Sequence, residues 1–160
     1  EIKFGGVDVD SINTNELLKN VTMVSQTTYL FDETIEDNLR IAKPDATQEE
    51  IEAACRMASV HEFILSLPDG YKTRVGALGD NLSAGEKQRI GLARAFLRGS
   101  EWILLDEPTS NVDSINEGII LKALQGQKRK KSILLVSHRE STMAIADRIY
   151  RVKDGRMAEI

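Results

Sequence analysis

Two apolar runs of strand length constrain the fold of this chain more strongly than any other feature. They are WILLDE at residues 102–107 and SILLVSH at residues 132–138. Uninterrupted apolar runs of this kind are typical of strands that a parallel sheet buries on both faces. A helical pattern from Ser114 to about Gln125 lies between them, and parallel strands need such a crossover connection. The order strand, helix, strand predicts an α/β fold with a parallel sheet and two buried strands.

A mostly helical stretch, from about residue 29 to residue 100, is inserted into this alternation. Residues 47–67 are predicted as one helix, because Thr47 and Glu50 have the spacing of a capping box and apolar residues follow with helical period. The apolar stripe of this helix consists of Ile51, Ala54, Cys55 and Ala58. His61 falls in the same helix, and we interpret it as structural.

Shorter signals mark the two ends of the chain. Residues 1–9 are predicted as short β structure broken by a Gly-Gly pair, and residues 20–25 as an extended run closed by Gln26. Ser114 and Glu117 have capping-box spacing, which predicts the start of the helix between the apolar runs. Near the C-terminus we expect a short helix (RESTMAIADR) and a strand pair joined by Asp-Gly (RIYRVKDGRMAEI).

Composition narrows the classes of function. The 160 residues carry 25 acidic and 21 basic side chains, a net charge of −4. This charge balance gives no indication of a basic surface that would bind nucleic acid. The basic run at residues 128–131 is interpreted as a solvated loop. The single cysteine, Cys55, excludes an internal disulfide. No apolar run approaches the roughly 20 residues that span a bilayer, and no signal-peptide pattern is present. Because the chain lacks an initiating Met and begins in a predicted strand, we expect a piece of a longer protein.

The segment LSAGE at residues 82–86 has two interpretations. Ser83 and Glu86 fit the pattern S-x-x-E, which alone predicts only the N-cap of a helix that ends near Gly99. The same geometry also directs backbone N–H groups and the positive helix end outward, beside a serine hydroxyl and a glycine that permits close approach. Such a helix start is suited to binding an anion.

Polar residues end three of the predicted strands: Gln26, the pair Asp106 and Glu107, and His138. Each alone is compatible with an ordinary polar strand end. Open α/β sheets, however, bind ligands at the carboxyl ends of their strands, and His138 would reach the same edge as Glu107. Because adjacent residues of an extended chain point in different directions, Asp106 can face a hydrated Mg²⁺ while Glu107 faces an attacking water.

The order of these motifs, with SNVD at residues 110–113, resembles the nucleotide-binding domain of ABC transporters over nearly all of the 160 residues. The segments YLFDETIEDNL and GYKTRVGALG resemble the exporter branch of that family. The matching family motifs are the Q-loop at Gln26, the signature at residues 82–86, the Walker B strand at 103–107, the D-loop at 110–113 and the H-loop at His138.

The resemblance implies a partial P-loop NTPase fold of the RecA-like type, a parallel sheet with an inserted, mostly helical subdomain. It divides the chain into core residues 1–28, a helical subdomain with the signature at 29–100, and core residues 101–160. It implies hydrolysis of ATP with Mg²⁺ to drive export across a membrane. The implied partners are a second nucleotide-binding domain, identical or different and paired head to tail, and a transmembrane domain in the same polypeptide. The domain would lie at the cytoplasmic face of the cell membrane.

The resemblance also assigns roles to the residues at the strand ends. Asp106 would hold Mg²⁺ through water, and Glu107 would be the general base for the attacking water. His138 would contact the γ-phosphate. Gln26 would sense Mg²⁺ and the attacking water, beside the groove that receives the membrane domain.

The signature would clamp ATP held by the partner domain through Ser83 and Gly85, and Asp113 would communicate across the dimer. This signature departs from the usual LSGGQ at two positions. Ala84 is tolerable if its φ is helical. Glu86 would weaken ATP binding if it pointed inward, whereas as a capping-box partner it would turn back toward the helix start.

A Walker A loop is missing from this sequence. Such a loop needs Gly-Lys-Ser/Thr before a helix, so that amides and the lysine cradle the phosphates. None of the 11 glycines is followed by lysine. We therefore expect this loop, and the aromatic residue that stacks on adenine, upstream of the chain. Alone, the fragment is expected to be inactive, because phosphoryl transfer depends on positioning.

Three alternatives stay open. The ABC-type ATPases of DNA repair and chromosome organisation carry long coiled-coil insertions, whereas the segment between Gln26 and Ser83 is compact and lacks heptads. A catalytically incomplete interaction or regulatory module is disfavoured by the intact Asp106-Glu107 pair and His138. An ABC importer ATPase subunit is disfavoured by YLFDETIEDNL.

Overall fold

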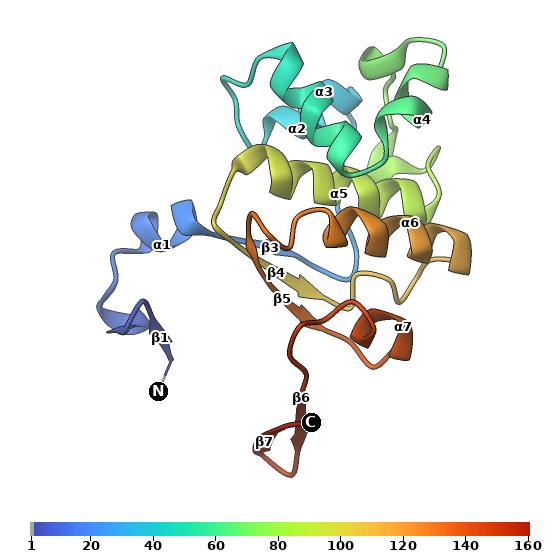
Figure 1. Cartoon of the computed structure of the whole chain (residues 1–160). Coiled ribbons are helices and arrows are strands. Elements are labelled where there is room, and N and C mark those ends of the chain that lie inside the picture. Colours follow the sequence, from blue (N-terminus) through green and yellow to red (C-terminus); the bar gives the residue numbers. More distant parts are fainter. Residues whose placement is uncertain (1) are drawn as a thin grey trace.

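A three-stranded parallel sheet organises the structure, a computed structural model that describes residues 2–160. The sheet has the order β3-β4-β5, with strands β3 (Val21–Val24), β4 (Trp102–Asp106) and β5 (Ser132–Val136) (Figure 1). The three strands share one register, because Leu104 pairs with Met23 on one side and with Leu134 on the other. The predicted α/β fold with a parallel sheet is confirmed.

Only one face of this sheet is well covered. Ile103 and Leu105 are 0% and 1% exposed and belong to the same core as α5 (Ala84–Arg98), whereas Leu134 and Val136 are 55% and 56% exposed. The prediction that SILLVSH is a buried strand is therefore wrong: the residues of this run are partly buried or exposed, and none is fully buried. Successive strand residues point to opposite faces, and the described residues bury one face much more completely than the other.

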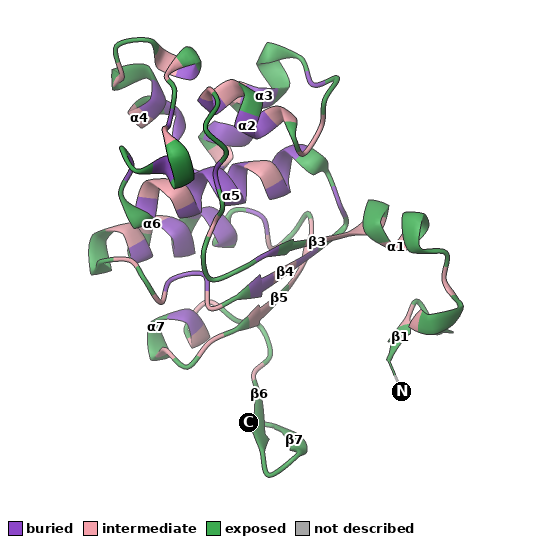
Figure 2. Ribbon diagram, turned by 180° about the vertical axis from the view of Figure 1, so that it is seen from behind, coloured by how far each residue is buried: buried purple, intermediate pink, exposed green. Residues whose placement is uncertain are grey.

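The helical part of the chain stacks on α5, on the side away from the sheet (Figure 1). Its helices are α2 (Ile35–Arg40), α3 (Gln48–Met57) and α4 (His61–Ser66). Figure 2 shows buried residues concentrated where these helices meet α5. The residues of the predicted stripe are at most 1% exposed; they are Ile51, Ala54, Cys55 and Ala58. This stripe is therefore part of the core that α3 shares with α5.

The single helix predicted over residues 47–67 is in fact two helices. α3 ends at Met57, Ser59 adopts a φ of 56°, and α4 begins at His61. A non-glycine residue at positive φ cannot continue a right-handed helix. The Val60 amide instead donates to the carbonyl of Cys55 at 2.9 Å, which closes the end of α3.

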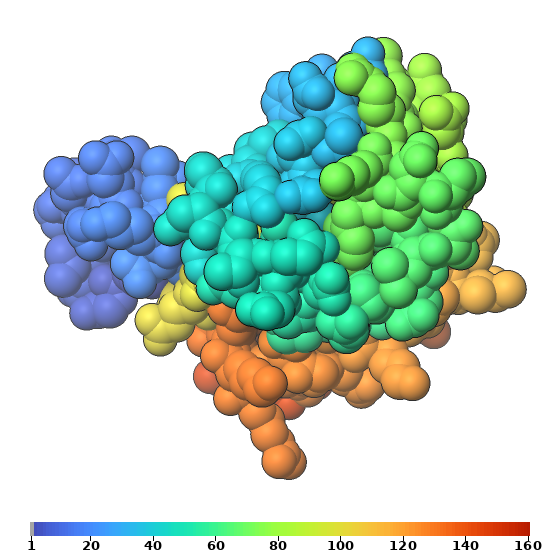
Figure 3. Space-filling view, turned by 90° about the horizontal axis from the view of Figure 1, so that it is seen from above, coloured from blue at the N-terminus to red at the C-terminus, as the bar shows by residue number. Residues whose placement is uncertain are grey.

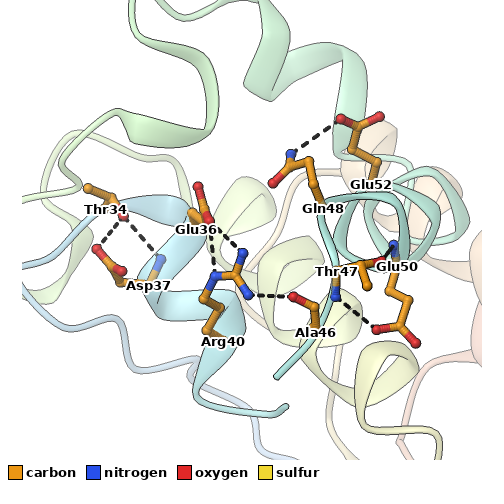
Figure 4. Close-up of polar contacts among 9 residues, drawn as sticks. All are labelled: Thr34, Glu36, Asp37, Arg40, Ala46, Thr47, Gln48, Glu50 and Glu52. Atoms are coloured by element: carbon orange, nitrogen blue, oxygen red, sulfur yellow. Dashed lines mark hydrogen bonds and ion pairs between the residues drawn. The ribbon is translucent and has the colours of Figure 1, made fainter. Parts of the chain in front are cut away.

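The capping box predicted at Thr47 is present (Figure 4). The Glu50 amide donates to the Thr47 hydroxyl at 3.2 Å, and the Thr47 amide donates to the Glu50 carboxylate at 3.0 Å. Just before it, Arg40 at the end of α2 donates to Glu36 and to the carbonyl of Ala46. Figure 4 shows these contacts side by side, and together they fix the loop between α2 and α3.

His61 belongs to a polar cluster in this helical part. Its Nδ1 lies 2.8 Å from the hydroxyl oxygen of Tyr71, and its Nε2 accepts from the guanidinium of Arg56 at 2.9 Å. Burial raises the pKa of the nearby Cys55 thiol to about 11. The cluster agrees with the structural interpretation of His61.

Smaller elements lie at the periphery. The antiparallel pair of β1 (Lys3–Phe4) and β2 (Val7–Asp8) precedes the helix α1 (Thr14–Asn20). The sequence patterns did not indicate α1. Figure 3 shows these elements as a lobe at the side of the molecule. Single 3-10 turns occupy Val9–Ser11, Gly70–Lys72 and Ala77–Gly79.

The remaining elements follow β4. They are α6 (Ser114–Gln125), α7 (Glu140–Met143), β6 (Tyr150–Lys153) and β7 (Arg156–Glu159). The predicted Asp-Gly hairpin joins β6 to β7, with φ of 51° at Asp154 and 70° at Gly155. Among residues 2–160, no helix combines the length and the apolar character that crossing a membrane requires.

The two faces of the sheet predict different sensitivities to truncation. Ile103→Ala should lower the free energy of unfolding by about 2–5 kcal/mol, because it leaves a cavity in the core. Leu134→Ala, on the neighbouring strand but exposed, should change it by about 0.5 kcal/mol or less. Urea unfolding of the chain measures both, and equal losses would contradict the unequal burial of the two faces.

Candidate functional site

The ends of β4 and β5 bring Glu107 and His138 into contact. The Glu107 amide donates to the carbonyl of Val136 at 2.9 Å and so continues the parallel ladder by one bond. His138 Nδ1 lies 2.8 Å from Glu107 Oε1, and because a carboxylate only accepts, this ring nitrogen carries the proton. The His138 side chain is 75% exposed, whereas that of Glu107 is 23% exposed. An imidazole open to solvent thus holds one oxygen of a mostly buried carboxylate.

The backbone at Glu107 is unusual. Its φ is 47°, in the left-handed region that costs a non-glycine residue about 1–2 kcal/mol. Its carbonyl accepts from both the amide and the hydroxyl of Ser110, at 3.2 and 3.0 Å. The expectation of an extended chain through Asp106 and Glu107 is therefore wrong: β4 ends at Asp106, and the chain turns at Glu107. Strain that the surroundings hold in place is a feature of functional sites.

Two carboxylate groups at this edge remain available to a ligand. Glu107 Oε2 is buried without a hydrogen-bond partner, although its Oε1 is held by His138. The side chain of Asp106 is exposed and makes no hydrogen bond or ion pair within residues 2–160. An orphaned, buried carboxylate oxygen fits a water molecule that it can polarise, and a free aspartate fits a hydrated cation.

Within residues 2–160, these carboxylates are not part of a cluster of metal-ligating side chains. Among residues 2–160, no group of three or more His, Cys, Asp or Glu side chains is placed to hold a metal ion. Mg²⁺ commonly binds one or two protein carboxylates and takes its other ligands from water and substrate phosphates. The residues present therefore suit Mg²⁺ that brings most of its ligands with it, as water or phosphate oxygens.

The LSAGE segment forms the start of α5 as a complete capping box. The Glu86 amide donates to the Ser83 hydroxyl at 3.3 Å, and the Ser83 amide donates to Glu86 Oε2 at 2.7 Å. Glu86 therefore turns back toward the helix start, which is the harmless of the two orientations considered for it. Ala84 is the first helical residue and is exposed, so its methyl group is accommodated. The amides of Ala84 and Gly85 precede the first intrahelical hydrogen bond and keep the character of an anion site.

Gly85 has a second reason to be glycine. It is buried, and a Cβ atom there would lie 2.7 Å from Cβ of Asn116 on α6 and closer still to the rest of that side chain. Asn116 Oδ1 accepts from Arg89, and its Nδ2 donates to Asp113 Oδ2 at 2.6 Å. One asparagine therefore joins the start of α5 to Asp113, the residue before α6. Neither Asn116 nor Arg89 was predicted from the sequence.

Asp113 is the N-cap of α6. Its Oδ1 accepts from the amides of Ile115 and Asn116, both at 3.0 Å, and hydrogen bonds from Asn116, first its amide and then its side chain, lower the pKa of the Asp113 carboxyl. The predicted capping box of Ser114 with Glu117 is wrong, because the cap lies one residue earlier. The Glu117 carboxylate instead bonds to Arg139.

The loop that contains Gln26 is held by α5. The buried amide of Gln88 donates to the carbonyl of Ser25 at 3.1 Å and accepts from the Thr28 hydroxyl at 2.9 Å. One turn further along α5, Gly91 packs against Thr28 so closely that a Cβ atom would lie 3.0 Å from Thr28 Cγ2. Gln26 itself is exposed and makes no hydrogen bond with the other candidate residues described here. Its loop is thus anchored on both sides while its side chain stays available.

Arg94 continues this attachment along α5. It donates to the carbonyl of Tyr29 at 2.6 Å and to the carbonyl and side chain of Asn38 at 2.7 and 2.6 Å. Burial lowers the pKa of Arg94 to about 10. The spacing of Gln88, Gly91 and Arg94 puts all three near one face of α5, and in the sequence this spacing indicates a helix but not the partners of these residues.

Comparison with known proteins shows which family this chain resembles. A family model described as “ABC transporter” matches residues 1–110. A Haemophilus influenzae protein named “Probable ABC transporter ATP-binding/permease protein” is 57% identical over 157 residues, which are 98% of this chain and 28% of that protein. The Caenorhabditis elegans “Multidrug resistance protein pgp-1” is 45% identical over 160 residues, 100% of this chain and 12% of that protein.

A solved structure is similar as well. The structure of a bacterial Atm1-family ABC exporter with ATP bound matches 96% of this chain with a TM-score of 0.88 and 34% sequence identity, and this chain covers 27% of it. The chain thus spans less than a third of the length of each of these three relatives.

The contact between Gly91 and Thr28 gives a test of how the Gln26 loop is anchored. Gly91→Ala should cost about 1–3 kcal/mol of unfolding free energy through overpacking, and Thr28→Ala about 1 kcal/mol through the lost bond to Gln88. In the double variant the added methyl group fills vacated space, so the loss should fall about 1 kcal/mol short of the sum.

A matched control is available on α6. A Cβ atom at Gly118 would meet nothing within 4 Å, so Gly118→Ala should stabilise the chain by up to about 1 kcal/mol. Urea unfolding measures all four variants, and strictly additive losses for Gly91→Ala and Thr28→Ala would show that these residues do not pack together.

Proposed function

The chain belongs to the ABC transporter family, and from that premise we propose that it supplies the hydrolytic and signature residues of an exporter's ATPase domain. The single observation that carries this proposal is the carboxylate of Glu107. One oxygen is held by His138, and the other is buried without a partner at the carboxyl end of a parallel strand. A general base for water needs such a carboxylate, oriented on one side and free on the other.

Each residue at the sheet edge has a part in the proposed reaction. Glu107 accepts a proton from the attacking water, and His138 orients Glu107 and contacts the terminal phosphate of bound ATP. Asp106 faces the Mg²⁺ of the nucleotide substrate through water. Gln26 reaches toward the same Mg²⁺ and water from its anchored loop. Little covalent chemistry is left to the protein, because phosphoryl transfer depends mainly on positioning and on stabilisation of charge.

The signature acts on a nucleotide that this chain does not cradle. Ser83, Ala84 and Gly85 present a helix start suited to phosphate, yet no Gly-Lys pair occurs in the sequence. We infer that the phosphate cradle comes from other parts of a longer polypeptide, and that the helix start closes over ATP held by a second such domain. Asp113 would respond to that contact, because Asn116 ties it to the start of α5. Residues 1–28 and 101–160 would form the core, and residues 29–100 the helical subdomain.

A transmembrane domain is the second proposed partner, and it would place the chain at the cytoplasmic face of the membrane. An open groove of about 700 Å³, lined by acidic and apolar residues shortly after Gln26, is a surface on which such a domain can dock. The groove residues are Phe31, Asp32, Glu33, Asp37 and Ile41. The proposed function is thus ATP hydrolysis coupled to export.

Glu107→Gln tests the proposed general base in the full-length protein. The substitution preserves size but removes the basic oxygen, so turnover of ATP should fall by at least about 10²-fold while ATP binding persists. Steady-state ATPase rates and nucleotide binding measure the two effects separately.

Glu101→Gln is the matched control, because Glu101 is exposed at the opposite end of β4. It should leave turnover unchanged. Wild-type turnover in Glu107→Gln would remove Glu107 from the proposed role.

A further inference from the structure

Arg139 links three elements around the proposed hydrolytic site. It lies between β5 and α7, and its guanidinium donates to Glu117 Oε2 at 2.6 Å and to the carbonyl of Ser110 at 3.3 Å. The other oxygen of Glu117 accepts from the Ser141 hydroxyl at 2.5 Å. Glu117 is 9% exposed, so this acid is buried with both oxygens occupied. Residues 139–141 are therefore fastened to α6 and to the turn after β4.

These contacts close a ring that contains both residues of the hydrolytic pair. Ser110 donates twice to the carbonyl of Glu107, and Arg139 donates to the carbonyl of Ser110. Arg139 follows His138 in the chain, and His138 returns to the side chain of Glu107. The ring thus runs through Glu107, Ser110, Arg139 and His138, and Glu117 anchors it from outside.

Outside the ring, the Glu107 amide is held by the carbonyl of Val136, whereas within residues 2–160 the side chain of His138 depends on the ring alone. Glu107 holds a φ of 47°, a conformation that persists only where its surroundings impose it. The His138 side chain is 75% exposed, and Glu107 is its hydrogen-bond partner within residues 2–160. The position of the imidazole therefore depends on the backbone around residue 138, which Arg139 fixes.

We propose that Arg139, anchored by Glu117, is a positioning residue that holds His138 against the carboxylate of Glu107. This inference rests on the proposed function. The guanidinium suits the task because its planar fork reaches a carboxylate and a carbonyl at once, whereas lysine presents a single ammonium group. Loss of Arg139 leaves the reacting groups in place but lets their relative orientation vary, and turnover then falls without a matching loss of ATP affinity.

The test compares ATPase kinetics of the full-length protein with Arg139→Met, His138→Ala and the double variant. Arg139→Met should lower kcat by about 10-fold or more and change KM by less than about 2-fold. Arg139 and His138 act through one contact. The kcat of the double variant should therefore lie within about 2-fold of the kcat of His138→Ala. Arg148→Met is the matched control, because Arg148 also pairs with a glutamate, Glu159, but at the exposed C-terminal end of the chain. The kcat of this variant should equal that of the wild type.

Unchanged kcat in Arg139→Met would overturn the inference, and so would losses that multiply in the double variant. If Arg139→Met fails to fold, Glu117→Gln replaces it. This variant keeps the shape of the anchor but weakens its bond to the guanidinium, and it should also lower kcat more than KM. A wild-type kcat in Glu117→Gln would overturn the inference equally.

Hydrogen exchange of the full-length protein gives a readout that does not depend on hydrolysis. In Arg139→Met the amides of Glu107 and Ser110, which donate to the carbonyls of Val136 and Glu107 respectively, should exchange at least about 10-fold faster, while those of α3 keep their rates. Unchanged exchange at residues 107–110 would overturn the inference. If the wild-type protein does not hydrolyse ATP, the proposed function fails, and the exchange comparison still decides whether Arg139 holds the turn.

Discussion

The pairing of β4 with β5 is the interaction on which the rest of this structure depends. The ladder continues one bond past the strand ends, from the Glu107 amide to the carbonyl of Val136. Because β4 and β5 end side by side at the paired residues Asp106 and Val136, Glu107 and His138 leave the sheet close together and their side chains meet. The positive φ at Glu107 then turns the chain into the D-loop, while Asp106 stays exposed at the edge. A few backbone hydrogen bonds thus bring the carboxylates of Asp106 and Glu107 and the imidazole of His138 to one edge of the sheet.

The signature helix α5 connects this edge to the helical part of the chain. At its start, the absence of a side chain at Gly85 lets Asn116 approach from α6. In its middle, Gln88 and Arg94 hold the segment that begins at the Gln26 loop. The side chains of Gln88 and Arg94 are buried or partly buried, and their hydrogen-bonding atoms have partners. Such side chains favour one arrangement of the chain, because any other arrangement would leave their polar atoms without hydrogen bonds. A displacement of the Gln26 loop is therefore expected to disturb the hydrogen bonds that Gln88 and Arg94 make from α5.

Local signals predicted most of the elements, whereas contacts between elements escaped prediction. The capping boxes at Thr47 and Ser83 and the Asp-Gly hairpin are set by neighbouring residues, so the sequence sufficed for them. The break at Ser59, the half-exposed face of β5 and the true cap at Asp113 were missed, because periodicity does not show where packing ends or which of two adjacent caps is used. Arg139 and Asn116 were missed for a related reason: their partners lie on other elements.

In the proposed function, this chain holds the hydrolytic and signature residues of an ATPase but not the cradle for the phosphates. Calorimetry of Mg²⁺–ATP binding tests it most directly, with the 160-residue chain and with a version extended upstream through the expected phosphate loop. Only the extended version should bind Mg²⁺–ATP, because a helix start and two carboxylates offer the nucleotide too few contacts. Tight binding of Mg²⁺–ATP by the 160-residue chain would contradict it, since the phosphate site would then lie within these residues.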